Sequence, residues 1–487
     1  KMTELHKLSI KEKLKGLKDS TFSSQELTES YLKRIKKLDN KINSFITVLE
    51  ERAVKSAKEA DQRYASGSAL PLDGIPIAHK DIFCTEGVLT SCGSRMLSNF
   101  ISPYSSTVVK NFEGSGSVVL GKTNMDEFAM GSSNETSYFG EVKNPWKKDY
   151  VPGGSSGGSA ACVSAGLASG ATGTDTGGSI RQPAALCGLT GIKPTYGRVS
   201  RYGMIAFASS LDQGGVLTKT AEDAAYMLKT MSGHDPKDST SLNIEVPDFV
   251  KEINKEIKGL RVGLPKQFFS MNLPEYVEQS INESLKVFEK LGVKIIDVDL
   301  PHIDLSLPIY YVIAPAECSA NLSRYDGVKF GYRCEDPKNL EDLYMRTREE
   351  GFGAEVKRRI LIGTYALSAG YYDAYYLKAQ KCRRLVANDF KETFKSVDLI
   401  LSPTAPDTSF ALGAKTSDPV EMYKQDIFTI PANLAGLPGI SVPCGQHQGL
   451  PLGLQLVSDN LEESKILRMA HHFQLNTDWH KSWPELA

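Results

Sequence analysis

The segment from Gly153 to Gly188 constrains the fold of this 487-residue chain more than any other part, because it is dense in glycines and hydroxyl side chains. It opens with the run Pro152-Gly153-Gly154-Ser155-Ser156-Gly157-Gly158-Ser159. Glycine costs about 0.5–1 kcal/mol relative to alanine in regular structure, so such a cluster is kept where backbone approaches another group closely or adopts a positive φ. The sequence predicts a tightly packed loop here, followed by a small-residue helix over 160–168 and a strand over 171–174.

Three interpretations of this run are open from its composition. A flexible Gly/Ser linker is disfavoured, because ordered apolar elements flank the run at once. A phosphate-binding P-loop requires GxxxxGK[ST], and no lysine follows these glycines at that offset. The third interpretation is a nucleophile site, in which glycines expose a hydroxyl and free backbone N–H groups that hold an oxyanion.

A second cluster, Asp175-Thr176-Gly177-Gly178-Ser179, favours the nucleophile site. Small residues just before Ser179 can direct several N–H groups at one point, as an acyl-transfer oxyanion requires. No Gly-x-Ser-x-Gly elbow is present, and the eight histidines show no triad order. Lys80, just past a short apolar run over 75–78, is the alternative base, because burial of a lysine favours loss of its proton.

Three ordered motifs resemble the amidase signature family. They are GIPIAHKD at 74–81, GGSSGGS at 153–159, and DTGGSIRQP at 175–183 followed by GIKPT at 191–195. Ser155 and Ser179 stand 24 positions apart, which is the spacing of that family. The resemblance implies that Ser179 is the nucleophile, that Ser155 relays its proton from beside a cis peptide bond, and that neutral Lys80 is the base. It also implies an oxyanion hole of backbone N–H groups from Thr176, Gly177, Gly178 and Ser179.

Four further segments, 125–132, 196–201, 321–327 and 435–440, resemble one branch of the family, the glutaminase subunits of tRNA-dependent amidotransferases. The likeness extends over nearly the whole chain. For a glutamine substrate it implies Arg359 at the α-carboxylate, which an arginine can bind bidentately, and Asp426 at the α-ammonium. It also implies that Gly131 and Tyr310 line the pocket.

Taken by themselves, these residues also fit ordinary structural or surface roles. Arg359 lies in a charged stretch and would otherwise be assigned to a solvated helix face. Asp426 could be a surface residue, and sequence does not separate Tyr310 from Tyr311 as the pocket residue. His79, next to Lys80, is expected to face the other way on a strand and to be structural. Tyr371, Tyr372, Tyr375 and Tyr376 recur at helical spacing and are expected to be packing residues rather than a platform that stacks on bases.

The resemblance further implies a division of labour within a complex of three different subunits. This chain would release ammonia from glutamine for conversion of Glu-tRNA(Gln) to Gln-tRNA(Gln). Conversion of Asp-tRNA(Asn) to Asn-tRNA(Asn) by the same complex is left open by the sequence, because that choice would lie in the partner. A B subunit would hold the tRNA and use ATP and Mg²⁺, and a small C subunit would clasp the two. No cofactor or metal is expected in this chain, which has no Walker motif and no carboxylate metal cluster.

Charge and cysteine content agree with this division. The chain has 57 Lys+Arg against 58 Asp+Glu and no basic stripe, which disfavours a nucleic-acid-binding module. Its eight scattered cysteines, without a CxxC pair, are typical of reduced and mostly buried thiols in a cytoplasmic protein. No segment has the length and apolarity of a membrane span or a signal peptide, so no membrane contact is expected.

The chain exceeds the roughly 250–300 residues at which one core usually stops growing, so a large domain with insertions or two fused units would fit its length. A strand–helix–strand unit over 260–264, 276–291 and 293–298 favours a parallel or mixed sheet. Other expected elements are a capped helix after Ser23, a tyrosine-rich helix over 368–388, a hairpin of 440–442 with 454–457, and a last helix from Asn460.

The fold class that follows is α/β, a single large domain whose mixed, twisted central sheet is covered by helices on both faces. Residues 1–70 are expected to form an N-terminal helical layer, packed on an amidase signature domain over 71–487. Two other functions compete with the glutaminase subunit. One is a free-standing amidase for another carboxamide, and the other is a non-catalytic scaffold, which the intact motifs around Lys80, Ser155 and Ser179 disfavour.

Overall fold

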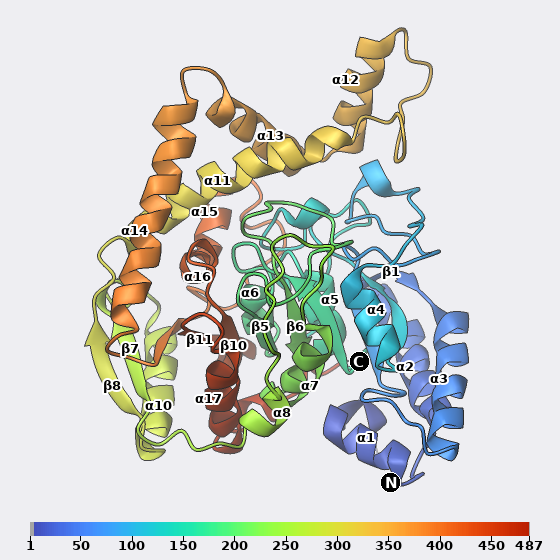
Figure 1. The fold of residues 1–487 in the computed structure, drawn as a ribbon, viewed down its shortest axis with the longest axis vertical. Coiled ribbons are helices and arrows are strands. Elements are labelled where there is room, and N and C mark those ends of the chain that lie inside the picture. The colour runs from blue at the N-terminus through green and yellow to red at the C-terminus, as the bar shows by residue number, and fades with distance from the viewer. Residues whose placement is uncertain (1–3, 487) are drawn as a thin grey trace.

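An eleven-stranded sheet runs through the molecule (Figure 1) in the computed structural model, which describes residues 4–486. From one edge to the other the strands are β1 (Phe45–Val48), β3 (Val118–Thr123), β2 (Pro76–Lys80), β4 (Gly170–Thr174), β6 (Gly214–Thr218), β5 (Thr190–Lys193), β10 (Gly439–His447), β11 (Leu450–Ser458), β9 (Leu399–Pro403), β7 (Arg261–Pro265) and β8 (Lys294–Val298). Strand β2 runs parallel to β3 and β4, and β7 runs parallel to β8 and β9. The remaining neighbours are antiparallel, so the sheet is mixed, as predicted.

Helices cover both faces of this sheet. They are α1 (Ile10–Lys18), α2 (Ser24–Leu38), α3 (Glu50–Ala65), α4 (Thr107–Gly114), α5 (Gly157–Ser164), α6 (Arg181–Leu186), α7 (Ala221–Met231), α8 (Phe249–Glu252), α9 (Lys266–Phe269), α10 (Glu275–Lys290), α11 (Ser306–Asn321), α12 (Leu340–Gly351), α13 (Ala354–Leu367), α14 (Lys378–Thr393), α15 (Pro419–Tyr423), α16 (Ile430–Leu434) and α17 (Glu463–Leu475). Short 3₁₀ turns are η1 (Leu5–Lys7), η2 (Asp39–Lys41), η3 (Arg95–Leu97), η4 (Glu127–Ala129), η5 (Ile303–Leu305), η6 (Leu322–Arg324), η8 (Lys424–Asp426) and η9 (Trp479–Lys481).

Two glycines of β4 show which helix lies on which face. A Cβ on Gly170 would meet Met227 of α7, whereas a Cβ on Gly173 would meet Ser156, just before α5. Because side chains alternate along a strand, positions three apart point to opposite faces. Helices α7 and α5 therefore cover opposite faces, and the predicted α/β architecture is confirmed.

The strands in the middle of the sheet are buried from solvent. Strands β2, β3, β4, β5, β6 and β9 are buried at every position, whereas the edge strands β1 and β8 are partly exposed. Strands covered on both faces are expected to be buried throughout. Lys80, the last residue of β2, is therefore held in the interior by the sheet itself.

The N-terminal helices form as the sequence predicts. The Ser23 hydroxyl accepts from the Glu26 amide while the Glu26 carboxylate accepts from the Ser23 amide, which is the expected capping box. The apolar face that follows, from Leu27 to Leu38, is buried. Residues 1–70 also supply β1, which pairs with β3, so this part of the chain is not purely helical. The division near residue 70 stays a prediction.

In the C-terminal half the structure confirms the strand–helix–strand unit and the hairpin, and it moves the start of the last helix. Strands β7 and β8 pair in parallel across α10, and β10 and β11 form the predicted hairpin. The last helix begins at Glu463 rather than at Asn460. Leu461 has a φ of +67°, and the buried Glu463 carboxylate accepts from the Thr195 amide and the Arg198 guanidinium. The glutamate therefore serves a tertiary contact instead of a cap.

The small-residue helix after the first glycine run is also displaced. Helix α5 covers Gly157–Ser164 and not 160–168. The Gly158 amide donates to the Asn124 carbonyl and to the Asn134 side chain, and a Cβ on Gly158 would lie only 2.2 Å from that carbonyl oxygen. The glycines that make close packing possible thus form the first turn of the helix itself.

The predicted tyrosine-rich helix is interrupted. A turn at Gly370, with φ +86°, is followed by the π-helix η7 (Tyr372–Leu377) and then by α14. Three of the four tyrosines, Tyr371, Tyr372 and Tyr375, are exposed, and their rings lie against neighbouring tyrosine rings rather than in the core. The wider π-helical turn, with i→i+5 hydrogen bonds, changes the phase of the side chains that α-helical spacing predicts.

The remaining sequence expectations concern the cysteines, membrane spans and metal sites. All eight cysteines are free, and seven are buried. Within residues 4–486, no helix combines the length and apolar character needed to cross a membrane. The same residues contain no group of three His, Cys, Asp or Glu side chains arranged to hold a metal ion.

Candidate active site

Lys80 is completely buried at the end of β2 and is surrounded by hydroxyl groups. Its Nζ lies 2.8 Å from Ser155 Oγ, 2.9 Å from Ser156 Oγ and 2.7 Å from Thr174 Oγ1. No carboxylate within residues 4–486 lies close enough to form an ion pair with it. A neutral amine suits this shell, because it can donate two hydrogens and accept a third from a hydroxyl. The sequence prediction named Ser155 but missed Ser156 and Thr174.

Burial also sets the protonation of this amine. It lowers the pKa of Lys80 from its ordinary 10.5 to about 7, against the opposing influence of the Asp126 and Asp175 carboxylates. Desolvation disfavours the charged form of a lysine, and the hydroxyls around Nζ carry no negative charge to compensate for it. Near neutral pH a substantial fraction of Lys80 is therefore unprotonated.

His79 points away from this cluster, as the alternation along a strand predicts. Its ring contacts Phe83 and Phe112, and its Nδ1 is hydrogen-bonded to Thr172 Oγ1 at 3.1 Å. Burial lowers the pKa of His79 to about 3. The structural role predicted for His79 fits these contacts.

The first glycine run is packed far too tightly to be a linker. Gly153 has a φ of +85°, and the peptide bond between Gly154 and Ser155 is cis, as the resemblance implies. A Cβ on Gly154 would lie 2.0 Å from Asp126 Oδ2, and one on Gly131 would lie 2.4 Å from the same carboxyl group. Asp126, which was not predicted, also accepts from the Asn134 amide. The buried carboxylate therefore supports both Gly131 and the loop that carries Ser155.

Ser179 lies beside this loop and is the most accessible member of the predicted triad. The Ser156 amide donates to the Ser179 carbonyl at 3.1 Å, which ties the two glycine-rich loops together. The Ser179 side chain is 9% exposed, whereas Lys80 and Ser155 are fully buried. Its Oγ has no hydrogen-bond partner within residues 4–486, so the Ser155 and Ser179 hydroxyls are not hydrogen-bonded to each other here.

The backbone before Ser179 is shaped by close contacts. A Cβ on Gly177 would lie 2.9 Å from the Tyr310 hydroxyl, and one on Gly178, where φ is +140°, would lie 2.1 Å from Thr429 Oγ1. The Gly178 amide donates to Asp175 Oδ1 at 2.8 Å, so this member of the predicted oxyanion hole is already engaged. The amides of Thr176, Gly177 and Ser179 donate to no acceptor among residues 4–486, and these three are the free donors.

Asp175 and Arg181 form the buried ion pair that holds this loop. The guanidinium donates from Nε and Nη2 to the two carboxylate oxygens, each at 2.9 Å. Burial alone would raise the pKa of Asp175, but the Arg181 charge outweighs it and lowers that pKa to about 2. The remaining guanidinium hydrogens bind the Thr429 carbonyl, Gln455 and Asn433. Both charges are fully satisfied at neutral pH.

Arg359 lines a second part of the site, a cavity of about 290 Å³ that Gly131 and Ser132 also line. It is buried on the inner face of α13, with the rings of Phe207, Tyr311 and Tyr423 5.3–5.7 Å from its guanidinium carbon. Only its Nε has an acceptor within residues 4–486, namely Glu355. The solvated-helix-face alternative for Arg359 is therefore wrong, and its two Nη groups are available to an anion.

Asp426 and Tyr310 lie between this cavity and the Ser179 loop. Asp426 Oδ2 accepts from the Ser132 hydroxyl, while its buried Oδ1 has no partner among the described residues. A Cβ on Gly178 would lie 3.0 Å from that free oxygen, and the Tyr310 hydroxyl is next to Gly177. Burial raises the pKa of Asp426 to about 7. The structure thus places all four predicted pocket residues around one region, although neither Asp426 nor Tyr310 lines the cavity itself.

Comparison with known proteins decides the family. The family model described as Amidase matches residues 26–467. The chain belongs to the amidase family. This confirms the resemblance that its serine and lysine motifs carry.

Several members of the amidase family are similar along almost their full length. The A subunit of glutamyl-tRNA(Gln) amidotransferase from Hahella chejuensis is 61% identical, over 98% of this chain and 99% of the relative. Its counterpart from Saccharophagus degradans is 60% identical, over 99% of each chain. The crystal structure of the A subunit of glutamyl-tRNA(Gln) amidotransferase from Thermotoga maritima is 43% identical, with a TM-score of 0.83 over 99% of this chain and 98% of that one.

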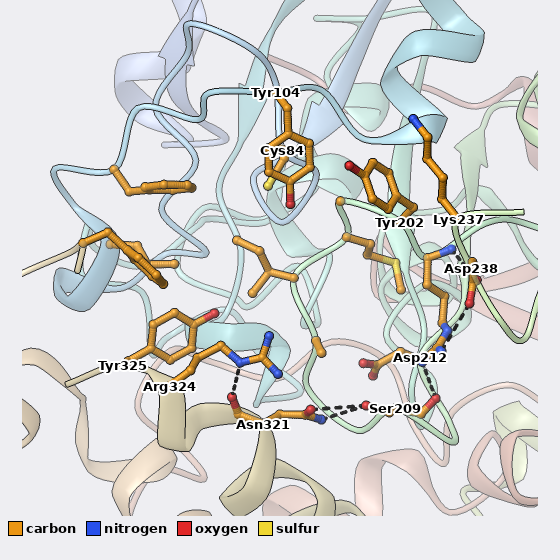
Figure 2. Close-up of a pocket in the computed structure, with 18 of the residues that line it drawn as sticks. Cys84, Tyr104, Tyr202, Ser209, Asp212, Lys237, Asp238, Asn321, Arg324 and Tyr325 are labelled. Carbon is orange, nitrogen blue, oxygen red and sulfur yellow. Dashed lines mark hydrogen bonds and ion pairs between the residues drawn. The ribbon is translucent and has the colours of Figure 1, made fainter. Parts of the chain in front are cut away.

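A further cavity of this amidase (Figure 2) has a volume of about 450 Å³. Asp212 lies in its wall and accepts hydrogen bonds from the Thr176 hydroxyl at 2.7 Å and from the Phe207 amide at 2.8 Å. Arg324 reaches into the cavity from the opposite wall, where its Nε donates to the Asn321 carbonyl (Figure 2). Asp212 was not predicted, because it follows the Ser179 loop by more than thirty residues and matches no quoted motif.

The ion pair under the Ser179 loop gives a stability prediction for this amidase. Arg181→Met would leave the Asp175 carboxylate buried without its counter-charge, so we expect the free energy of unfolding to fall by about 3–5 kcal/mol. Urea titration followed by circular dichroism measures this. Arg261→Met is the matched control, because Arg261 forms a surface pair with Asp398 and is 38% exposed. Equal stability of the two variants would contradict a structural role for the buried pair.

Proposed function

We propose that this chain is the glutaminase subunit of a tRNA-dependent amidotransferase. It would hydrolyse the side-chain amide of glutamine and supply ammonia for conversion of Glu-tRNA(Gln) to Gln-tRNA(Gln). The observation that carries the hydrolytic part is the buried Lys80 amine, 2.8 Å from Ser155 Oγ and with a pKa of about 7. The choice of substrate is supported by the full-length identity to relatives named as A subunits of glutamyl-tRNA(Gln) amidotransferase.

In the proposed mechanism, Ser179 Oγ attacks the amide carbonyl carbon of glutamine. Its proton passes to Ser155 as the Ser155 proton passes to the Lys80 amine, so Lys80 becomes an ammonium while the tetrahedral oxyanion forms. The free N–H groups of Thr176, Gly177 and Ser179 would hold that oxyanion. Ser179 must turn toward Ser155 for this step, because their hydroxyls are not hydrogen-bonded to each other in the structure.

Collapse of the intermediate returns the proton from Lys80 through Ser155 to the leaving nitrogen, and ammonia departs. The γ-glutamyl ester left on Ser179 is then attacked by water, which gives its proton through Ser155 to Lys80. As the second tetrahedral intermediate collapses, the relay returns that proton to Ser179 Oγ, and glutamate is released. Ser156 and Thr174 would hold the Lys80 amine in place throughout, because each lies within 2.9 Å of Nζ.

Recognition of glutamine requires a cation for its α-carboxylate and an anion for its α-ammonium. Arg359 offers two free Nη groups, which suit a carboxylate in bidentate geometry. Asp426 offers a buried carboxylate oxygen without a partner among residues 4–486. A bound ammonium group would favour the ionised form of Asp426 and bring its pKa back down. Gly131 and Tyr310 would shape the space between these charges and Ser179.

The rest of the reaction is proposed to lie outside this chain. A B subunit would bind the tRNA and activate the γ-carboxyl of its glutamyl group with ATP and Mg²⁺, and a C subunit would hold the two together. Activity on Asp-tRNA(Asn) would be decided by that B subunit. The near balance of charge in this chain supports a minor part in tRNA binding. Its eight free cysteines support work in the cytoplasm.

Ser179→Ala tests the proposed function. We expect ammonia release from glutamine by the assembled complex to fall by about a thousandfold or more, because no other hydroxyl occupies the nucleophile position. A coupled glutamate dehydrogenase assay measures the release. The control is amidation of Glu-tRNA(Gln) by the same variant complex with ammonium chloride as nitrogen donor, which should persist.

Retention of glutaminase activity by this variant would refute the assignment of Ser179 as the nucleophile. A free-standing amidase would behave differently from a glutaminase subunit. The isolated wild-type chain would then turn over aryl or fatty amides rapidly and would ignore glutamine.

Arg359→Lys tests how glutamine is held. Lysine keeps the charge but loses the planar pair of donors, so we expect KM for glutamine to rise by about tenfold or more, with a smaller change in kcat. Steady-state kinetics of the complex measure both constants. Arg348→Lys is the control, because Arg348 is a partly buried arginine that donates to the Leu322 and Tyr325 carbonyls. An unchanged KM in Arg359→Lys would contradict the proposed carboxylate contact.

A further inference from the structure

Glu355, in the first turn of α13, lies in the wall of the cavity of about 290 Å³ and takes no part in the proposed chemistry. Its Oε1 accepts hydrogen bonds from Arg359 Nε at 2.9 Å and from the Tyr423 hydroxyl at 2.7 Å. Its Oε2 pairs with the Arg358 guanidinium. The side chain is 14% exposed. This carboxylate therefore joins three donors at the edge of the site where glutamine is proposed to bind.

The contact with Glu355 decides how Arg359 can bind a carboxylate. A guanidinium can hold a carboxylate in bidentate geometry either through Nε and one Nη or through both Nη groups. Because Glu355 already occupies Nε, only the two Nη groups are open to a substrate. The same hydrogen bond fixes the rotation of the guanidinium plane, so these donors are aimed before glutamine arrives. Preorganised donors bind more tightly, because less side-chain freedom is lost on binding.

The hydroxyl of Tyr423 extends this control to a second element. The Tyr423 ring stacks on Tyr311 with the ring centroids 3.9 Å apart, and both centroids lie 5.3–5.4 Å from the Arg359 guanidinium carbon. Tyr423 ends α15, and the turn η8 that follows it directly ends at Asp426. Glu355 therefore connects α13, which carries Arg359, to the segment that carries Asp426.

A structural role explains only part of this arrangement. An acidic residue in the first turn of a helix and an ion pair between positions i and i+4 both stabilise a helix. These effects account for the contacts of Glu355 with Arg358 and Arg359, which lie on α13 as well. They do not account for the hydrogen bond from Tyr423, which comes from another element and lies at the cavity wall.

We propose that Glu355 is a positioning residue for glutamine recognition. It aims the two Nη groups of Arg359 at the α-carboxylate and, through Tyr423, sets their distance from Asp426. The site then selects carboxamides whose far end carries a carboxylate and an ammonium group on one carbon atom. This inference rests on the proposed function, and Glu355 itself touches no substrate atom.

Glu355→Ala, made in the full chain and assembled with the B and C subunits, tests this role. We expect KM for glutamine to rise about tenfold or more, with kcat changed by less than about twofold, because the triad keeps its contacts while Arg359 loses its fixed aim. Glu355→Gln should recover most of the loss, since its side-chain oxygen still accepts from Arg359 and Tyr423. Tyr423→Phe removes only one hydroxyl and should raise KM by about threefold. Both constants are measured from ammonia release in the coupled assay.

A double-mutant cycle with Arg359→Lys separates positioning from general damage to the cavity. Because Glu355 acts through Arg359, adding Glu355→Ala to Arg359→Lys should change KM by less than about twofold. The competitive inhibitor γ-aminobutyramide, which is glutamine without its α-carboxylate, provides the second readout. Its inhibition constant should be the same in the wild type and in Glu355→Ala, because it has no carboxylate for Arg359 to bind.

Glu350→Ala is the matched control. Glu350 also accepts from a tyrosine hydroxyl, that of Tyr332, and pairs with an arginine four positions away, Arg346. It lies on α12 and is not among the residues within 4–486 that line the cavity. We expect its KM for glutamine to equal that of the wild type. Thermal unfolding followed by circular dichroism should show comparable changes in the two alanine variants.

Three results would overturn the proposal. They are a wild-type KM in Glu355→Ala, an undiminished effect of Glu355→Ala in the Arg359→Lys background, and a parallel rise in the inhibition constant of γ-aminobutyramide. Failure of the proposed function looks different, because the wild-type complex would then release no ammonia from glutamine at all.

Discussion

The burial of one amine governs the rest of this structure. Lys80 is the last residue of a strand that is buried at every position. Its Nζ is surrounded by three neutral hydroxyls, and no carboxylate among residues 4–486 lies within ion-pair distance of it. Such a shell satisfies the hydrogen bonds of the amine without stabilising its charge, so the proton becomes labile near neutral pH. A histidine base is not required when a lysine is held in this way. The sheet, by covering both of its faces, supplies the low-dielectric surroundings that the chemistry needs.

The loops around that amine owe their close packing to glycines, which have no side chain. Gly154 lies against Asp126, Gly177 against Tyr310, and Gly178 against Thr429, in each case closer than a Cβ would allow. The two loops are tied by the Ser156 amide and the Ser179 carbonyl, and the second loop is anchored by Asp175 and Arg181. Glycine density is therefore a consequence of bringing a buried lysine, two serines and free amides into one small volume.

Much of this could be predicted from sequence, because motifs encode local geometry. The positions of Lys80, Ser155 and Ser179, the capping box at Ser23, the parallel unit around α10 and the C-terminal hairpin all depend on residues close in sequence. Ser156 and Thr174 were missed although each neighbours a predicted residue, because sequence does not tell which of two adjacent hydroxyls faces the amine. Asp212 was missed because its contact with Thr176 joins distant segments.

The errors share a physical cause, which is competition between local and tertiary contacts. Glu463 was expected to cap a helix, but its carboxylate is drawn to Thr195 and Arg198. The Gly178 amide was expected to face an oxyanion, but it donates to Asp175. The helix predicted over 368–388 is interrupted by a π-helical turn at Tyr372–Leu377, in which Tyr372 and Tyr375 are exposed.

Direct titration of the Lys80 side chain tests the central claim most closely. With lysine labelled at ¹³Cε and ¹⁵Nζ, NMR spectra of the wild type and of Lys80→Met identify the Lys80 signal, and its shift is followed from pH 5 to pH 11. The structure predicts a midpoint near 7, with the amine protonated below that pH and neutral above it. A midpoint close to the ordinary value of 10.5 would contradict the account, because a lysine charged at neutral pH cannot accept the serine proton.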